Sequence, residues 1–390
     1  MATLNLAPAT YADYRRLAEK RLPRRLFDYV DGGAGDEVTM ADNEGALGRL
    51  RLRQRVMRDV SGIDTSTQLL DESWSMPLAL APVGLAGMMA RRAEVQAQHA
   101  AAAAGIPFCA STVGICSVEE IAAASERPFW FQLYMLRDRG AVTEILQRAR
   151  DAGVSTLVFT VDLAVVGARH RDTRNGMNGG SGVLGELRAG LLDYLAHPAW
   201  LLDVGVRGKP HLFGNLAEYV PSAHTPADFK DWVDSQFDPS VTWKDIEWLR
   251  AHWDGRLLIK GVLDPEDALA AARAGADAVI VSNHGGRQLD GVSPTATMLP
   301  RVVDALGDAV PVLMDGGVRN GQDVARVLAL GARAAMIGRP WVFALAARAE
   351  EGLTAMLESY RSDLQVAMAL TGSRTLDRPT AETPDREPPR

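Results

Sequence analysis

Eight short apolar runs lie between residues 78 and 338, and amphipathic, alanine-rich stretches separate most of them. The runs show little of the alternation between apolar and polar residues that marks a strand with one face in water. Continuous apolar runs are typical of parallel strands that are covered on both faces. The runs are residues 78–82, 106–111, 129–134, 156–162, 257–260, 278–282, 312–315 and 334–338. Eight strands that alternate with helices predict an α/β fold of the (β/α)8 type, a TIM barrel.

Helix-start signals between the apolar runs support the (β/α)8 prediction. Asp264, Pro265 and Glu266 supply an N-cap, a proline at the first helical position and an acid in the first turn of a helix. Roughly 90 residues separate the fourth run from the fifth, well beyond the usual β–α spacing. We expect one helix near residues 243–250, and we interpret the remainder, about 165–240, as an insertion at the mouth of the barrel.

The two ends of the chain differ from the barrel region. Tyr11, Tyr14 and Leu17 recur at helical spacing, and a glycine-rich stretch at 32–35 ends that pattern, so residues 1–75 are expected to form a helical lead-in. Residues 376–390 are charged and proline-rich, which is typical of disorder. We therefore expect one domain over residues 1–375 and a disordered tail.

Composition excludes several classes of function. The net charge is −7 and no basic tract occurs, which argues against nucleic acid as a partner. Cys109 and Cys116 lack metal-ligand spacing, so we expect two reduced thiols and no metal site. The N-terminus lacks the pattern of a signal peptide, and no apolar run reaches the roughly 18–20 residues of a spanning helix. We expect a cytoplasmic protein.

Polar residues follow nearly every apolar run, where a TIM barrel places its active site. Any one of them could be structural, but their convergence on one face predicts an active site without naming its reaction. They are Gln132, Tyr134, Thr160, Asp162, Lys260, Ser282, His284, Arg287, Asp315, Arg319, Gly338 and Arg339.

The loops after the last two runs indicate a phosphate. Residues 315–319 read Asp-Gly-Gly-Val-Arg, and Gly338 with Arg339 follows the eighth run. Glycines let backbone N–H groups approach an anion, and arginine adds charge-assisted hydrogen bonds. These loops predict a phosphate-bearing ligand; the alternative is two ordinary glycine turns.

Lys260 and His284 make that ligand a flavin candidate. A lysine at position 260 could face the pyrimidine edge of an isoalloxazine, where negative charge develops on reduction. Arg287 would lower the pKa of nearby His284 by like charge and leave it a free base, while Asp162 would stabilise the imidazolium. Arg287 would also grip a substrate carboxylate. The alternative is that His284 and Arg287 only organise their loop.

The stretch Ser282-Asn-His-Gly-Gly-Arg-Gln-Leu-Asp290 resembles the signature of the FMN-dependent L-2-hydroxy-acid dehydrogenases and oxidases. The resemblance extends from about Tyr11 to Leu376. It is greatest to the bacterial quinone-linked L-lactate dehydrogenases, in residues 81–88, 131–140 and 243–248. It implies FMN-dependent oxidation of an L-2-hydroxy acid, most simply L-lactate, with electrons passed to a quinone or another acceptor, and it implies a homotetramer.

The resemblance also implies residue roles. His284 would be the base and Asp162 its partner, while Tyr134 would bond the substrate near its hydroxyl. Arg287 and Tyr29 would bind the carboxylate, with help from Arg169. The residues implied to bind FMN are Pro82, Val83, Gly84, Ser111, Gln132, Thr160, Lys260 and Ser282, and for its phosphate Asp315, Gly317, Arg319, Gly338 and Arg339.

Three positions depart from the family pattern. Val113 stands where several oxidases carry Trp, which leaves a roomier pocket. Gly84 stands where oxidases usually have Ala, which favours a dehydrogenase that uses an acceptor other than oxygen. Ala164 replaces a proline that is common after the Asp of the fourth run, so the course of that loop is open.

The insertion carries a leucine-rich segment. Leu184, Leu187, Leu191 and Leu195 share one face of a predicted helix, and a Trp lies among leucines at 198–202. This predicts peripheral membrane contact through about 178–215, which would bring reduced FMN near a membrane quinone. A core-facing or oligomer-facing helix would explain the same leucines. Rival functions also stay open: an oxidase that makes hydrogen peroxide, a mandelate dehydrogenase, an FMN-barrel isomerase, and a silent barrel that binds phosphorylated ligands.

Overall fold

The structure is a computed structural model that describes residues 7–177, 187–219, 235–376 and 381–382 of the 390-residue chain. Eight strands lie side by side in one parallel sheet, in the order β4-β11-β10-β9-β8-β7-β6-β5. An isolated parallel bridge from Leu80 to Phe108 joins β4 to β5 and closes the sheet into a barrel. The strands are β4 Leu78–Leu80, β5 Cys109–Ser111, β6 Trp130–Leu133, β7 Thr156–Thr160, β8 Arg256–Val262, β9 Ala278–Val281, β10 Val312–Met314 and β11 Ala334–Ile337. The predicted (β/α)8 barrel is confirmed.

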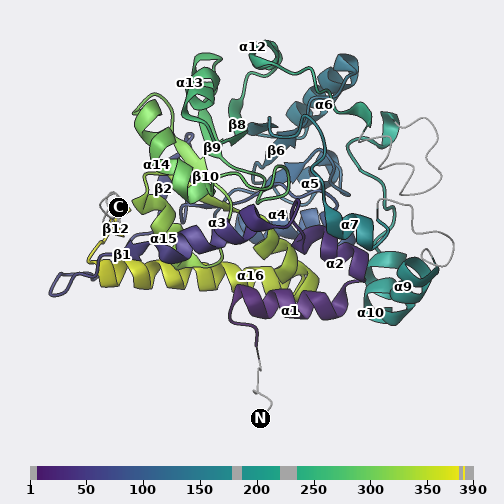
Figure 1. Cartoon of the computed structure of the whole chain (residues 1–390), viewed down its shortest axis with the longest axis horizontal. Coiled ribbons are helices and arrows are strands. Elements are labelled where there is room, and N and C mark those ends of the chain that lie inside the picture. Colours follow the sequence, from purple (N-terminus) through teal and green to yellow (C-terminus); the bar gives the residue numbers. More distant parts are fainter. Residues whose placement is uncertain (1–6, 178–186, 220–234, 377–380, 383–390) are drawn as a thin grey trace.

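Helices surround the barrel (Figure 1). One of them, α13, begins at the cap that the sequence indicated. The Asp264 side chain accepts the Glu266 N–H at 2.7 Å and so starts α13. The helix expected near 243–250 is α12. The outer helices are α4 Ala93–Ala104, α5 Val118–Ala123, α6 Arg139–Asp151, α12 Trp243–His252, α13 Pro265–Arg273, α14 Thr295–Leu306, α15 Gly321–Ala329 and α16 Arg339–Thr371, the last with a kink at Arg348 and Ala349.

A hairpin plugs one end of the barrel. It consists of β2 Thr67–Leu69 and β3 Glu72–Trp74, and Trp74 packs on Trp130, at the start of β6, with ring centroids 5.5 Å apart. This closes the N-terminal end of the strands and leaves the C-terminal end for the site. Cys109 and Cys116 are buried free thiols, as expected, and burial raises the pKa of each.

The lead-in supplies three helices, α1 Tyr11–Arg21, α2 Arg24–Asp31 and α3 Val38–Arg49. Helix α1 packs along α16 (Figure 1). Gly32, in the glycine-rich stretch, is the C-cap of α2. Two residues of the tail that we expected to be disordered, β12 Ala381–Glu382, pair antiparallel with β1 Arg51–Leu52. The rest of the tail beyond Leu376 lies outside the described residues.

The described part of the insertion contains α7 His170–Arg174, η2 Leu187–Leu192, α9 Asp193–Ala196, α10 Pro198–Trp200, η3 Leu201–Val206 and η4 Ala217–Tyr219. Polar contacts hold it to the lead-in: Arg21 pairs with Asp203 at 2.8 Å, and the Arg24 N–H donates to Asp193 at 2.6 Å. Residues 178–186, with Leu184, lie outside the described residues. In the parts of the chain that the structure describes, no helix is long and apolar enough to cross a membrane.

The leucines that can be described face solvent. Leu191, Leu195 and Leu202 are each more than half exposed. A core-facing helix would bury these side chains, so that alternative is wrong for them.

Candidate functional site

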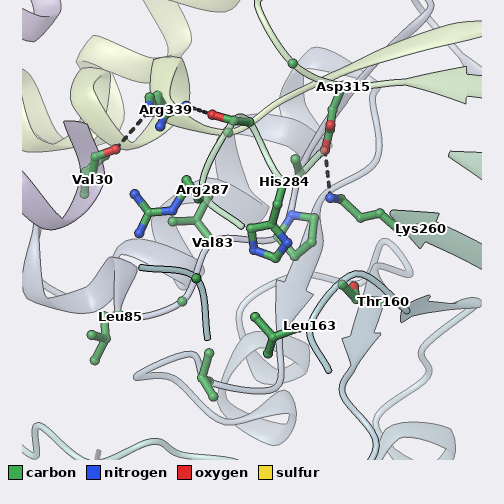
Figure 2. Close-up of a pocket in the computed structure, with 18 of the residues that line it drawn as sticks. Val30, Val83, Leu85, Thr160, Leu163, Lys260, His284, Arg287, Asp315 and Arg339 are labelled. Carbon is green, nitrogen blue, oxygen red and sulfur yellow. Dashed lines mark hydrogen bonds and ion pairs between the residues drawn. The ribbon is translucent and has the colours of Figure 1, made fainter. Parts of the chain in front are cut away.

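A cleft opens at the C-terminal ends of the strands and holds about 1410 Å³ of empty space, open solvent at its mouth included. Residues from the barrel strands, from the lead-in and from the insertion line it. The cleft brings together fifteen of the predicted site residues from barrel, lead-in and insertion (Figure 2). These are Tyr29, Pro82, Val83, Gly84, Tyr134, Thr160, Arg169, Lys260, His284, Arg287, Asp315, Gly317, Arg319, Gly338 and Arg339.

The imidazole of His284 projects into this cleft (Figure 2). Its Nδ1 lies 2.9 Å from Oδ1 of Asp162, which fixes Nδ1 as the donor and leaves Nε2 as the acceptor. The backbone of His284 is left-handed, with φ 57°, and Gly285 and Gly286 continue that conformation. The Ser282 hydroxyl caps the turn by accepting the His284 N–H at 3.1 Å.

Burial lowers the pKa of His284, and the Asp162 carboxylate opposes that effect by stabilising the imidazolium. Lys260 and Arg169 lower the pKa further, so the net shift is downward. The direction agrees with the sequence analysis, but the leading cause is burial and the main cations are these two rather than Arg287. His284 is therefore a neutral base at neutral pH.

Two arginines, Arg287 and Arg169, share the cleft wall. Arg287 stacks on Tyr29, its guanidinium carbon 5.0 Å from the ring centroid, and donates to the Gly32 carbonyl at 2.7 Å. Arg169 donates to the Arg287 carbonyl at 3.4 Å. Neither forms an ion pair with a carboxylate of the described residues, although the Asp172 carboxylate acts to raise the pKa of Arg287. Burial and then Arg169 lower the pKa of Arg287 to about 9, a cost that a bound anion would relieve.

Lys260 occupies the barrel floor of the cleft (Figure 2). Its ammonium pairs with Asp315 at 2.8 Å and donates to the Ser282 hydroxyl at 2.9 Å. Burial lowers the pKa of Lys260, but Asp315 and Asp162 outweigh it, so the net shift is upward and the lysine is charged. Asp315, which we had assigned to the phosphate, places its carboxylate on this lysine. A carboxylate repels a phosphate, so its side chain suits hydroxyl donors instead.

The residues predicted to bind the phosphate lie between the last two strands and α16. Gly317 has φ 82°, and a Cβ there would clash with the Asn43 carbonyl, so only glycine fits. Arg319 is paired with Glu44 at 2.8 Å. Arg339 donates to the carbonyls of Val30, Gly285 and Gly32 at 2.9, 2.9 and 2.8 Å (Figure 2). Arg339 forms no ion pair with a carboxylate of the described residues, and its charge at the N-terminus of α16 favours an anion.

Four predicted residues lie behind the cleft wall. Asp162 accepts a hydrogen bond from His284, and the Ser282 hydroxyl accepts one from Lys260. Ser111 donates to Gln132 at 3.1 Å, and both are buried.

Sequence reasoning missed an apolar part of the wall: Leu85, Leu163, Val166, Phe213 and Phe237. Phe237 packs edge-on against Tyr134, with centroids 5.0 Å apart. The two phenylalanines lie outside the β–α period, so no strand-end pattern could have indicated them.

Comparison with known proteins agrees with this geometry. The family model for FMN-dependent dehydrogenases matches residues 18–384. The chain belongs to the FMN-dependent dehydrogenase family. The resemblance inferred from the signature at 282–290 is thereby confirmed, and the chain is an FMN-dependent oxidoreductase.

Members of this family with named activities are similar over nearly their full lengths. A protein of Caulobacter vibrioides named L-lactate dehydrogenase is 56% identical over 362 residues, 93% of this chain and 94% of that protein. A protein of the same name from Pseudomonas aeruginosa is 49% identical over 375 residues, 96% of this chain and 97% of that protein.

Solved structures share the fold. The crystal structure of (S)-mandelate dehydrogenase, described as a monotopic membrane protein, has a TM-score of 0.89 and 34% identity, and the match covers 96% of this chain and 99% of that one. Mandelate oxidase has a TM-score of 0.79 and 36% identity, with 95% and 96% covered.

The cleft fits the family's cofactor. Among the buried polar atoms that have no partner within the described residues are Gln132 Nε2, Thr160 Oγ1 and Asp315 Oδ1. All three lie at strand ends in or against the cleft wall, and such atoms cost free energy unless a ligand satisfies them. A flavin ring and ribityl chain carry the donors and acceptors they need. FMN therefore suits the residues present.

Proposed function

We propose that this protein oxidises L-lactate, or a closely related L-2-hydroxy acid, to the 2-oxo acid and passes the electrons to a membrane quinone. The observation that carries the proposal is the pairing of a neutral base with unpaired cations in one cleft. His284 is bonded to Asp162 at 2.9 Å, and Arg287 lies in the same wall and forms no ion pair with a carboxylate of the described residues. The names of the similar proteins favour L-lactate.

The substrate carboxylate would bind between Arg287, Arg169 and the Tyr29 hydroxyl. Two guanidinium groups that form no ion pair within the described part of the chain supply the charge, and Arg287 can bond a carboxylate with two parallel N–H groups. Binding an anion there would offset the burial of two like charges. Orientation of the carboxylate would set the C2 carbon toward His284.

His284 Nε2 would take one of the two protons that the substrate loses. Asp162 would hold the imidazole in the required tautomer and stabilise the imidazolium that forms, as the direction of its effect on the His284 pKa indicates. Burial raises the pKa of Tyr134, and Asp162 raises it further, so its phenol stays a neutral donor for the substrate oxygen.

Bound FMN would supply the acceptor for the two electrons. Lys260 would place its charge at the floor of the cleft, and its pairing with Asp315 and Ser282 holds it there. The residues proposed to hold the cofactor are the strand-end set named above, with Gln132 and Thr160 satisfying their free polar atoms on it.

We further propose peripheral membrane contact through the described part of 178–215, on the inner face of the cell membrane. Leu191, Leu195, Leu202 and Val206 are exposed, and Arg207 beside them is exposed too. Apolar side chains next to a cation suit a membrane interface with anionic lipids. The monotopic character of the mandelate dehydrogenase supports this placement. A homotetramer remains our prediction, to be checked by light scattering.

Anaerobic titration of the purified flavoprotein tests the proposal. L-lactate should bleach the flavin absorbance with one equivalent per site, while D-lactate should not. L-mandelate and glycolate in the same experiment define the side-chain range, since Val113 stands where several oxidases of the family carry the larger Trp. Fast reoxidation by air with peroxide as product would favour an oxidase, and a flavin that no 2-hydroxy acid bleaches would contradict the proposal.

A further inference from the structure

The loop at residues 32–36, between α2 and α3, lies over the mouth of the barrel. The Gly32 carbonyl accepts hydrogen bonds from Arg287 at 2.7 Å and from Arg339 at 2.8 Å. The Ala34 N–H donates to the Gly286 carbonyl at 2.8 Å. Tyr29, on which Arg287 stacks, lies on the last turn of α2 just before this loop. The position of the loop therefore sets the position of the Arg287 guanidinium.

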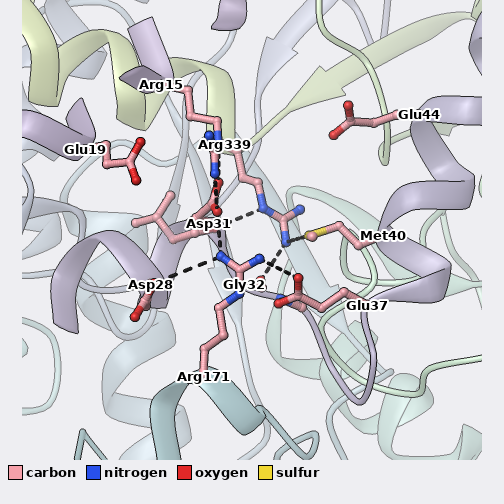
Figure 3. A network of polar contacts seen from close by, with 12 residues as sticks. Arg15, Glu19, Asp28, Asp31, Gly32, Glu37, Met40, Glu44, Arg171 and Arg339 are labelled. Carbon is pink, nitrogen blue, oxygen red and sulfur yellow. Dashed lines mark hydrogen bonds and ion pairs between the residues drawn. The ribbon is translucent and has the colours of Figure 1, made fainter. Parts of the chain in front are cut away.

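Arg171 clamps both ends of this loop (Figure 3). One guanidinium nitrogen pairs with Asp31, the last residue of α2, at 2.6 Å, and the other pairs with Glu37, the residue that caps α3. Glu37 also accepts the Gly33 N–H at 3.0 Å. It adopts a left-handed backbone with φ 65°, a conformation that costs free energy in a residue other than glycine.

Among the described residues, Arg171 is the one side chain that pairs with both Asp31 and Glu37. Arg339 also spans the loop, through the Val30 and Gly32 carbonyls and the sulfur of Met40, but it makes no ion pair with either carboxylate. Arg15 also pairs with Asp31, at 2.6 and 2.7 Å, but it comes from α1 and makes no bond to Glu37. Loss of Arg15 would therefore leave the two ends joined. Loss of Arg171 would leave Asp31 paired with Arg15 but would break the link between Glu37 and α7.

Arg171 also lies close in sequence to a proposed carboxylate ligand. Arg169 caps the start of α7, two residues earlier. The Gly35 N–H donates to the carbonyl of Ala168, the residue before it, at 2.9 Å. Arg171 itself does not line the cleft, so its influence on a ligand there would pass through these neighbours.

We propose that Arg171 is a positioning residue for the substrate carboxylate: by joining Asp31 to Glu37 it fixes the loop whose Gly32 carbonyl orients Arg287. This inference rests on the proposed function, because it takes Arg287 as the carboxylate clamp. It assigns a role to α7, the first helix of the insertion. This role is separate from the membrane contact proposed for the exposed leucines.

The test is anaerobic stopped-flow reduction of the flavin in Arg171→Gln, over a range of L-lactate concentrations. The apparent Kd for L-lactate should rise about tenfold, since a charge-assisted contact is loosened rather than removed, while the limiting rate changes less than about twofold. Inhibition by lactamide, which lacks the carboxylate, should be unchanged, and FMN content should equal that of the wild type. Arg171→Lys should show an intermediate Kd, because one ammonium cannot bridge both carboxylates as a guanidinium does.

Arg148→Gln is the matched control, because Arg148 pairs with Glu119 on the outside of the barrel and should leave the Kd unchanged. A Kd for L-lactate in Arg171→Gln equal to that of the wild type would overturn the inference. An equal loss of affinity for L-lactate and for lactamide, accompanied by a loss of bound FMN, would overturn it as well. Should L-lactate leave the wild-type flavin oxidised, the proposed function fails instead. Perturbation of the flavin spectrum by oxalate in both proteins then still tests whether Arg171 supports carboxylate binding, and equal oxalate affinities would overturn it.

Discussion

The backbone of His284 holds a left-handed conformation that most side chains avoid. Such a conformation costs about 1–3 kcal/mol and persists only where its surroundings enforce it. Here the Ser282 hydroxyl caps the turn and Asp162 holds the imidazole, while two glycines that tolerate the conformation follow. The strain aims Nε2 into the cleft instead of along the strand.

The pH dependence of turnover should report the pKa of this histidine. Burial lowers that pKa from 6.5, and the base must be unprotonated to act, so kcat/KM should rise through an apparent pKa below 6.5 and then level off. In Asp162→Asn the carboxylate that raises the pKa is lost. The maximal rate should fall steeply, and the acidic limb should move to lower pH. A limb that moves to higher pH would contradict the pairing.

Gly84 allows a second test at the scale of single residues. A Cβ there would lie 2.6 Å from a methyl of Val113 and 3.2 Å from the Tyr29 hydroxyl. Overpacking costs about 1–3 kcal/mol, so Gly84→Ala should raise KM for L-lactate by about tenfold. Gly84→Ala combined with Val113→Ala removes the nearer clash and should restore most of the affinity. Steady-state kinetics decide between these outcomes, and a Gly84→Ala enzyme with unchanged KM would contradict the predicted crowding.

At the scale of elements, the apolar pattern of the sequence predicted the strands, and the polar residues after the apolar runs predicted part of the site. Each apolar run became a strand, because burial on both faces leaves the same continuous pattern in any parallel sheet. The site residues at the strand ends could be predicted because each of them lies at or directly after the end of one of these apolar runs. Phe213, Phe237 and Arg171 were not predicted, since they lie in or after an insertion whose course no periodicity fixes. Tyr29 was found only through the family resemblance.

The described part of the insertion carries a prediction of its own. Replacing Leu191, Leu195 and Leu202 by Ser should weaken binding to vesicles that contain anionic lipid, because each leucine is more than half exposed and would lose its burial in the interface. Flavin reduction by L-lactate should be unchanged. Val366→Ser with Leu370→Ser, two residues of similar exposure on α16, is the control and should keep vesicle binding. Co-sedimentation measures both, and equal binding by the two variants would argue against this surface.

Across the whole molecule, residues from strands, lead-in and insertion meet in the one cleft, so a ligand there joins parts far apart in sequence. A ligand that binds only the folded state raises stability in proportion to its affinity. Removal of FMN should therefore lower the thermal midpoint, and added FMN should restore it. Riboflavin, which lacks the phosphate, should restore it only in part if Arg339 and Gly317 hold that group. Full restoration by riboflavin in calorimetry would count against the phosphate assignment.

The central claim is that His284 is the base for a 2-hydroxy acid bound by its carboxylate. The most direct measurement is stopped-flow reduction of the flavin by L-lactate in His284→Gln, with bound FMN counted in the same sample. We predict full FMN content and a limiting rate about 10²–10⁴ times lower than that of the wild type, which is the usual contribution of a positioned base. Flavin reduction at the wild-type rate would contradict the account.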